Sequence, residues 1–522
     1  MFTFTHNAAK FIQISMVILP LIFSFIDQIH FFQLNSYKPK THLRWLKKNP
    51  PKFLINLGIG ALAAMCSLIS SLAVRSAVWT VIFIAAMVVC FPRKGKKPLV
   101  FTPRVKRLLT TAILFSAVVL GVCAVKLENA FSFAPALLFA LAEFVMLIAN
   151  LINMPMEKGI NRHYTNEAKK LLESAADTMK TIGITGSYGK TSVKYYLTSL
   201  LRAKYNTLMT PESYNTPMGV VKTVRGSLRA IHEVFVCEMG ARWKGDIKEL
   251  CDIVHPQIGI ITSVGPQHLE SFGSLDVVKQ TKFELADALP ADGMLFVNGD
   301  DANIASYIGS RKAVRYGVSE GCDYRAEDIC VSDKGTAFSV TSPCGEKQQF
   351  TTRLLGRHVI INLTGAIAVA NKMGIPMSKL KGAVRKLEGV EHRLQLTNKN
   401  GLTLIDDAYN SNPNGAKAAL EVINLFDGFK IIVTPGMVEL GEKQEELNRE
   451  FGREIAEVCD FAVLVGQKQA APIKEGLAGA GYSEDKIYVA DTIEQALSFV
   501  YTLSSDGRKK VVLLENDLPD NY

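Results

Sequence analysis

The sequence predicts an α/β protein in which an N-terminal α-helical transmembrane region precedes the catalytic part. Three observations support this prediction: long apolar runs confined to the first third, a charge imbalance between that third and the rest, and a glycine-rich loop between a predicted strand and a predicted helix. At roughly 100–200 residues per domain, the 522 residues correspond to about three domains. With 48% hydrophobic residues, the chain is too apolar for a disordered protein.

The transmembrane prediction depends on five apolar stretches. A helix needs about 20 apolar residues to cross the hydrocarbon core of a bilayer. The second, fourth and fifth stretches reach this length, and the first and third are shorter. The first stretch lacks the basic start of a signal peptide, so we expect a retained helix. The stretches cover about residues 11–26, 54–74, 77–91, 108–125 and 131–152.

The charge pattern predicts an orientation. Residues 1–170 hold 20 basic and 5 acidic side chains, a net charge of +15, whereas the remainder holds 39 and 44, a net charge of −5. The basic residues gather after the first and third stretches, and such loops normally face the cytoplasm. With five spans, everything after residue 153 lies on the cytoplasmic side of a multi-pass cell-membrane protein that contacts membrane lipids. Nucleic acid is not an expected partner, because no basic groove with interleaved aromatic residues is evident.

A phosphate-binding loop is predicted in the middle of the chain. Residues 180–185 read as a buried strand, and residues 193–201 are apolar at helical spacing. A glycine-rich turn between a strand and a helix lets backbone N–H groups surround phosphate oxygens. The spacing is G-x-x-G-K-T, because Ile184 breaks the longer pattern. Lys190 would reach the terminal phosphates and the Thr191 hydroxyl would ligate Mg²⁺. The alternative is a plain turn that caps a helix. The loop residues are Gly186, Ser187, Tyr188, Gly189, Lys190, Thr191 and Ser192.

Two further polar residues follow predicted strands. Glu238 ends an apolar run, and His268 lies in the polar turn after the strand at about 258–264. Ligands of open α/β sheets bind beyond the carboxyl ends of the strands. Glu238 and His268 are therefore candidate ligands for a second Mg²⁺. Because Mg²⁺ prefers oxygen ligands, His268 taken alone fits a hydrogen-bonding turn residue better.

Six ordered motifs between about residues 176 and 470 resemble the Mur ligase superfamily, and within it the MurF branch, whose members add D-Ala-D-Ala to UDP-MurNAc-tripeptide. The phosphate loop is the first of them. The others are Glu238-Met-Gly with Gly265-Pro-Gln-His268-Leu-Glu, Lys279-Gln-Thr-Lys282, Gly356-Arg-His358-Val-Ile-Ile-Asn362, Glu391-His-Arg393 with Asp406-Asp407-Ala-Tyr409-Asn410, and Met437-Val-Glu439-Leu-Gly441.

The resemblance implies an ATP-dependent carboxylate–amine ligase of peptidoglycan synthesis that activates its acceptor as an acyl phosphate. It implies a P-loop ATPase-like central domain and a Rossmann-like C-terminal domain. We expect a transmembrane region over 1–155, the central domain over 156–375 and the C-terminal domain over 376–522. The partners expected are a nucleotide- or lipid-linked cell-wall precursor and an amino acid or dipeptide. The alternatives are a polyglutamate-type ligase and a non-ligase membrane NTPase.

The resemblance also assigns site residues. Lys190, His268 and Lys282 are the expected catalytic residues. Two Mg²⁺ ions are expected on Thr191, Glu238, His268 and Lys282, the last carrying CO₂ as a carbamate. Nucleotide contacts are expected from Asn362, Arg393, Asp407 and Asn410. The simpler readings are a surface lysine for Lys282, a linker charge for Arg393 and a helix N-cap for Asp407.

The chain departs from the MurF pattern in places that concern its substrates. Membrane spans stand where MurF has its UDP-binding domain. The segment Pro435-Gly436-Met437 replaces a Gly-Asp-Met segment, and Asn448 stands where the family has a histidine; both lie where the incoming amine is expected. Val359 replaces an asparagine of the adenine segment.

Overall fold

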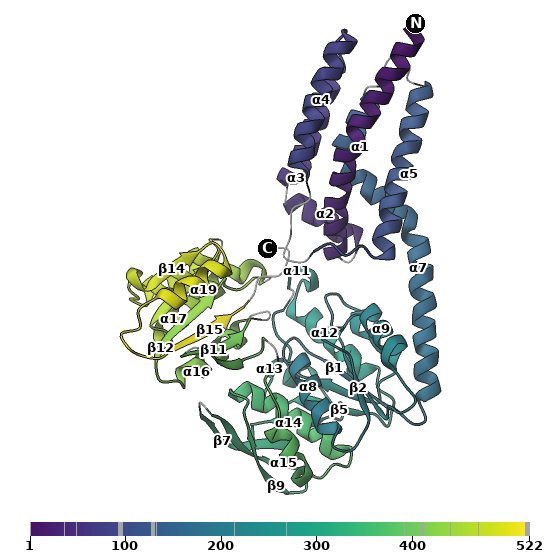
Figure 1. Ribbon diagram of the computed structural model, residues 1–522. Coiled ribbons are helices and arrows are strands. Elements are labelled where there is room, and N and C mark those ends of the chain that lie inside the picture. Colours follow the sequence, from purple (N-terminus) through teal and green to yellow (C-terminus); the bar gives the residue numbers. More distant parts are fainter. Residues whose placement is uncertain are drawn as a thin grey trace. The chain divides into compact units, whose positions relative to one another are not determined.

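The computed structural model divides the chain into two compact units, residues 1–163 with 520–522 and residues 164–519 (Figure 1). We call these the helical unit and the ligase unit, and the division falls inside helix α7 (Ala142–Ala175). The structure describes all residues except 1, 36, 49, 92–97, 127–130, 132, 213, 268, 333, 391, 400, 409–411, 439, 468 and 517–522.

The helical unit consists of helices around one apolar core. Helix α1 packs against α4 and α5, and α3 packs against α6. Large side chains such as Phe25, Trp79 and Phe139 fill this core, while many other apolar side chains face outward. The helices are α1 (Phe2–Leu34), α2 (Pro39–Lys48), α3 (Pro50–Cys66), α4 (Leu72–Val89), α5 (Pro103–Lys126), α6 (Phe133–Ala140) and α7 (Ala142–Ala175).

Two described helical segments, Ile14–Leu34 and Pro103–Lys126, are long and apolar enough to cross a membrane, and the bent pair α6–α7 makes a third if it counts as one span. Two of the five predicted stretches are interrupted in the structure: the fifth, over 131–152, is bent by 75° between α6 and α7, and the second ends early. The helix expected over 54–74 ends at Cys66, where the Ser67 hydroxyl bonds back to the Ala63 carbonyl, and α4 begins only at Leu72. Serine side chains compete for backbone groups in this way and favour helix ends. The remaining apolar helices, Phe53–Cys66 and Val74–Val89, are shorter.

The first sheet of the ligase unit has nine strands in the order β2-β3-β1-β4-β5-β6-β7-β8-β9. Neighbours from β2 to β7 are parallel, and β7, β8 and β9 pair antiparallel. The strands are β1 (Lys180–Thr185), β2 (Thr207–Met209), β3 (Val234–Glu238), β4 (Ile258–Ile261), β5 (Met294–Asn298), β6 (Val314–Gly317), β7 (Tyr324–Ser332), β8 (Gly335–Thr341) and β9 (Lys347–Thr352).

Helices connect these strands. Helix α8 follows β1 and packs against α14, and α10 packs against α12. The helices are α8 (Lys190–Leu201), α9 (Pro217–Ser227), α10 (Asp246–Val254), α11 (Leu269–Phe272), α12 (Leu275–Asp287), α13 (Ala302–Tyr307), α14 (Arg357–Lys372) and α15 (Met377–Arg385).

The second sheet has six strands in the order β10-β11-β15-β12-β13-β14, parallel except for the β10–β11 pair. With the nine-stranded sheet it confirms the predicted α/β class. The elements are β10 (Gln395–Lys399), β11 (Leu402–Asp407), α16 (Pro413–Asn424), β12 (Phe429–Thr434), η1 (Gly441–Lys443), α17 (Gln444–Val458), β13 (Phe461–Val465), α18 (Ala470–Gly479), η2 (Glu484–Lys486), β14 (Ile487–Ala490), α19 (Ile493–Thr502) and β15 (Lys510–Glu515).

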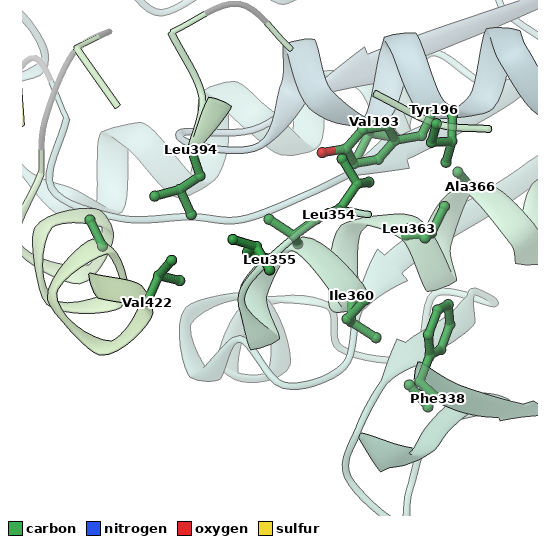
Figure 2. Close-up of a cluster of buried hydrophobic side chains, with 14 of the residues drawn as sticks. Val193, Tyr196, Phe338, Leu354, Leu355, Ile360, Leu363, Ala366, Leu394 and Val422 are labelled. Carbon is green, nitrogen blue, oxygen red and sulfur yellow. The ribbon is translucent and has the colours of Figure 1, made fainter. Parts of the chain in front are cut away.

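One large apolar cluster of the ligase unit contains buried residues from the elements around both sheets. Figure 2 shows Val193 and Tyr196 of α8 with Leu354 and Leu363, and it also shows Leu394 and Val422 from the second half of the unit. Val193 and Leu363 are fully buried. The cluster supports α8, the helix that begins at the predicted phosphate loop.

Candidate active site

The glycine-rich loop between β1 and α8 has the geometry of a phosphate-binding loop. Gly189 has a φ of +80° directly before the first residue of α8, a conformation that glycine adopts without a Cβ clash. At Gly186, with φ +153°, a Cβ atom would lie 2.1 Å from the Thr262 hydroxyl oxygen. Backbone N–H groups at such a helix start favour an anion.

Hydrogen bonds hold this loop against the segment that follows β4. The Ser187 N–H donates to the Ser263 carbonyl at 2.8 Å, and the Tyr188 N–H donates to the Ser263 hydroxyl at 2.8 Å. The Ser187 hydroxyl donates to the Gly265 carbonyl at 3.1 Å and accepts from the Gly265 N–H at 3.0 Å. The ends of β1 and β4 therefore form one rigid edge.

The side chain of Lys190 bends back toward the loop that precedes it. Its ammonium donates to the carbonyls of Gly186 at 2.6 Å and Ser187 at 3.0 Å. Burial lowers the pKa of Lys190 to about 8, and the nearby carboxylate of Glu238 opposes this shift. The cation thus lies at the loop where the backbone N–H groups would meet phosphate oxygens.

Glu238, at the end of β3, is 1% exposed and is surrounded by polar partners. Its Oε1 accepts from the Thr191 hydroxyl at 3.2 Å and from the Asn215 amide at 3.0 Å. Its Oε2 lies 3.0 Å from the Lys194 ammonium. Burial alone would raise the pKa of Glu238, but the charges of Lys194 and Lys190 lower it. The structure therefore brings the predicted ligands Thr191 and Glu238 into contact, with the carboxyl ionised.

Two residues of this cluster were not predicted from sequence. Lys194 is fully buried and also donates to the Glu212 carbonyl, which lies in the segment that carries Asn215. The available signal for Lys194 was a lysine within an apolar helical stretch, four residues after Lys190. Nothing in the sequence around Asn215 pointed to Glu238, because the two meet only through the sheet.

Lys282 of α12 lies buried, at 2% exposure, and not on the surface as its simpler reading suggested. Its ammonium lies 5.9 Å from the centre of the Phe272 ring. Burial, and then the charge of Lys190, holds the pKa of Lys282 well below its usual value. Glu284 points elsewhere, because it accepts from the N–H groups of Gly245 and Lys248 at the start of α10. His268 lies outside the described residues.

The predicted nucleotide residues that the structure describes form two groups: Asn362 lies at the glycine-rich loop, and Arg393 and Asp407 interact with each other. The side chain of Asn362 packs on Gly189, since a Cβ there would meet its Oδ1 at 2.8 Å. Burial raises the pKa of Asp407 to about 6, although Arg393 acts in the opposite direction. Asp407 accepts from the Leu394 N–H at 3.2 Å, and the charge of Arg393 also reaches Lys190. Asn410 lies outside the described residues.

Both polar atoms of the Asn448 side chain, on α17, form hydrogen bonds within the ligase unit. Its Oδ1 accepts from the Met437 N–H at 2.8 Å, and its amide donates to the carbonyls of Met437 at 2.9 Å and Gln444 at 2.8 Å. Gly436 has a φ of +77°, and a Cβ there would meet Asn448 Oδ1 at 2.8 Å. Asn448 thus fixes the turn after β12.

Comparisons with known proteins agree with this arrangement. The Mur ligase middle domain matches residues 184–370, and the Mur ligase glutamate ligase domain matches residues 392–514. The UDP-N-acetylmuramoyl-tripeptide–D-alanyl-D-alanine ligase of Haemophilus influenzae is 32% identical over 343 residues, which cover 64% of this chain and 73% of the relative. The chain belongs to the Mur ligase family.

The other relatives point to the same branch of this family. The ligase of the same name from Bacillus subtilis is 31% identical over 300 residues, which span 57% of this Mur ligase and 65%, just under two thirds, of the relative. The crystal structure of MurF from Acinetobacter baumannii matches with a TM-score of 0.62 and 28% identity, over 68% of this chain and 77% of that chain. MurF of Thermotoga maritima in complex with ADP, at 24% identity and a TM-score of 0.61 over 68% and 80%, shows the same fold.

Proposed function

We propose that this chain is an ATP-dependent carboxylate–amine ligase of the MurF type that acts in peptidoglycan precursor synthesis. The contact of Thr191 with Glu238, beside Lys190 in the glycine-rich loop, is the observation that carries the proposal. A hydroxyl and a carboxylate oxygen are the ligands that Mg²⁺ prefers, and a loop of N–H groups with one lysine suits ATP phosphates. The names of the relatives support the same activity.

The chemistry follows from the poor reactivity of a carboxylate. One of its oxygens attacks the γ-phosphorus of ATP, the bond to the bridging oxygen breaks, and ADP leaves. The acyl phosphate is then attacked by an amine, which forms the amide, loses a proton and releases phosphate. The chain's part is to hold and offset charge: Lys190 would move from the loop carbonyls to phosphate oxygens, and Thr191 and Glu238 would hold Mg²⁺, which neutralises charge on the transferred group.

Lys282 is the proposed carrier of a second oxygen ligand. Its lowered pKa supports a neutral amine near neutral pH, and only a neutral amine attacks CO₂. A new N–C bond and the loss of one proton would give a carbamate, whose oxygens would bind a second Mg²⁺ with His268. Incubation with ¹³C-bicarbonate should give a carbamate ¹³C resonance in the wild type and none in Lys282→Arg. A resonance that persists in Lys282→Arg would refute the assignment.

We also propose the substrates of the protein and its location in the cell. The acceptor would be a peptidoglycan precursor linked to a nucleotide or to a lipid, and the amine a D-Ala-D-Ala dipeptide or a single amino acid. Helices of the helical unit would anchor the protein in the membrane with the ligase unit on the cytoplasmic side. The two apolar helical segments that are long enough to span support the anchor.

Mass spectrometry of reaction products tests the function. Purified full-length protein would receive ATP, Mg²⁺, nucleotide-linked or lipid-linked precursors and candidate amines. The expected product is the acceptor plus the amine minus one water, formed together with ADP and phosphate, and Lys190→Ala should form far less of it. ATP hydrolysis that is equally fast without acceptor and amine would favour the non-ligase NTPase instead.

A further inference from the structure

A polar stripe runs along the inner face of α7 in the helical unit. Its members are Glu143, Asn150, Asn153 and Glu157, whose side chains are 0%, 4%, 7% and 6% exposed. Spacings of seven, three and four residues place them on one side of a helix. The core around them is apolar, with Val145, Met146 and Ala149 on the same helix. Polar residues inside helices apolar enough for a membrane are costly and usually functional.

Three members of the stripe have complementary partners. Glu157 lies 2.7 Å from the guanidinium of Arg107 and 3.9 Å from that of Arg104. The Asn153 Oδ1 accepts from the hydroxyl of Thr111 at 3.0 Å, and the Asn150 amide donates to a backbone carbonyl at 3.2 Å. The carboxylate of Glu157 is thus offset by two positive charges.

Glu143, at the other end of the stripe, has only neutral partners. Its Oε1 accepts from the amide of Asn56 at 2.7 Å and from that of Gln28 at 3.5 Å. The Asn56 amide also donates to the hydroxyl of Ser24 at 2.9 Å. Among the residues that the structure describes, no lysine or arginine forms an ion pair with Glu143.

Two acceptor oxygens of this cluster are buried and receive no hydrogen bond from any residue that the structure describes. They are Glu143 Oε2 and Gln28 Oε1. A buried acceptor that lacks a donor is unfavourable, because it has lost its hydrogen bonds to water, and the cost is larger when the group is charged. Helices α1, α3 and α7 thus bring together a carboxylate, two amides and a hydroxyl. The two oxygens named above can still accept a positively charged ligand. The other titratable groups within electrostatic reach are Asp27 of α1 and Cys90 of α4.

We propose that Glu143, Gln28, Asn56 and Ser24 form a binding site for one small monovalent cation, either a proton or a sodium ion. A proton would bind at Glu143 Oε2, and a sodium ion would take Glu143 Oε2 and Gln28 Oε1 as ligands. Either would supply the charge that Arg104 and Arg107 supply to Glu157. The site is separate from the ligase chemistry and does not depend on it.

The test measures cation-linked stability of the full-length protein in detergent. A ligand that binds only the folded state raises stability with the logarithm of its concentration. In a Trp243→Phe background, fluorescence reports only Trp45 and Trp79, both in the helical unit. One series replaces choline chloride by NaCl at constant ionic strength and mildly alkaline pH. The other lowers the pH in choline chloride.

We expect the thermal midpoint of the wild type to rise with each tenfold increase in Na⁺ or in H⁺, and the series that responds identifies the cation. Glu143→Gln, which keeps an acceptor for Asn56 but no charge, should lose this slope. Glu157→Gln is the matched control on the same helix and should keep it. Gln28→Leu should keep the slope but shift it to higher concentration if sodium is the ligand. Equal slopes in wild type and Glu143→Gln, or no slope in either series, would overturn the proposal.

Discussion

Each unit of this protein contains a glutamate that is almost completely buried, and the partners of the two glutamates differ. Glu238 in the ligase unit meets an ammonium, a hydroxyl and an amide, and the charges around it hold its pKa below the usual value. Among the described residues, the side-chain partners of Glu143 in the helical unit are the amides of Asn56 and Gln28. A buried charge is tolerated only when it is paired and hydrogen-bonded. The ligase unit therefore supplies a counter-charge to Glu238, whereas Glu143 has an oxygen to which no described residue donates.

The largest expected effect comes from removing the counter-charge of Glu238. Lys194→Met leaves a buried carboxylate without its ammonium, and breaking one partner of a buried pair costs about 3–5 kcal/mol. Chemical denaturation of the full-length protein measures this loss, monitored by the fluorescence of Trp243 in a Trp45→Phe/Trp79→Phe background. The matched control is Lys248→Met, which breaks the exposed pair with Asp252 and should cost no more than about 0.5 kcal/mol. Similar losses in the two variants would remove the contrast between Glu238 and Glu143.

A comparable effect on activity is expected at Lys190. Lys190→Ala removes a cation that donates to the loop carbonyls, and losing such a charge-stabilising donor typically lowers kcat by about 10²–10³-fold. Steady-state product formation measures the loss, and unchanged helical content by circular dichroism excludes unfolding. Lys244→Ala, a substitution of an exposed lysine, is the control and should retain activity. A variant of Lys190 with full activity would refute its role at the phosphates.

The third effect is a pH dependence of stability that comes from Asp407, whose burial is only partly offset by the charge of Arg393. Burial raises the pKa of Asp407 from 3.8 to about 6, so the folded state binds this proton more tightly than the unfolded state. Between about pH 4 and 6 the protein therefore loses stability as pH rises, by at most about 3 kcal/mol from this group. Asp407→Asn should be more stable than wild type near neutral pH and should flatten the profile. An unchanged urea midpoint across that range would contradict the expected burial cost.

The sequence predicts the ligase unit better than the helical unit, for a physical reason. The strand, glycine loop and helix around Lys190 are local in the chain, so spacing alone predicted them and the structure has them. Lys194 and Asn215 reach Glu238 only through the pairing of β1, β2 and β3, which no local pattern reports. In the helical unit, hydropathy located apolar helices but not the break at Cys66, because Ser67 and its neighbours do not reduce the apolar character of the stretch enough.

The smallest expected effect tests how tightly the phosphate loop is packed. A Cβ at Gly265 would lie 2.6 Å from the ring of Tyr188, so Gly265→Ala should destabilise the protein by about 1–3 kcal/mol through overpacking. In a Tyr188→Ser background the same substitution should cost clearly less, because the ring that it meets is gone. Gly382→Ala in α15, where nothing lies within 4 Å of the added methyl, should instead stabilise by about 0.5–1 kcal/mol. Urea denaturation of the wild type, Gly265→Ala, Tyr188→Ser and the double variant gives the coupling energy between Gly265 and Tyr188. A coupling near zero would mean that the loop gives way without cost, and the edge formed by the ends of β1 and β4 would then not be rigid.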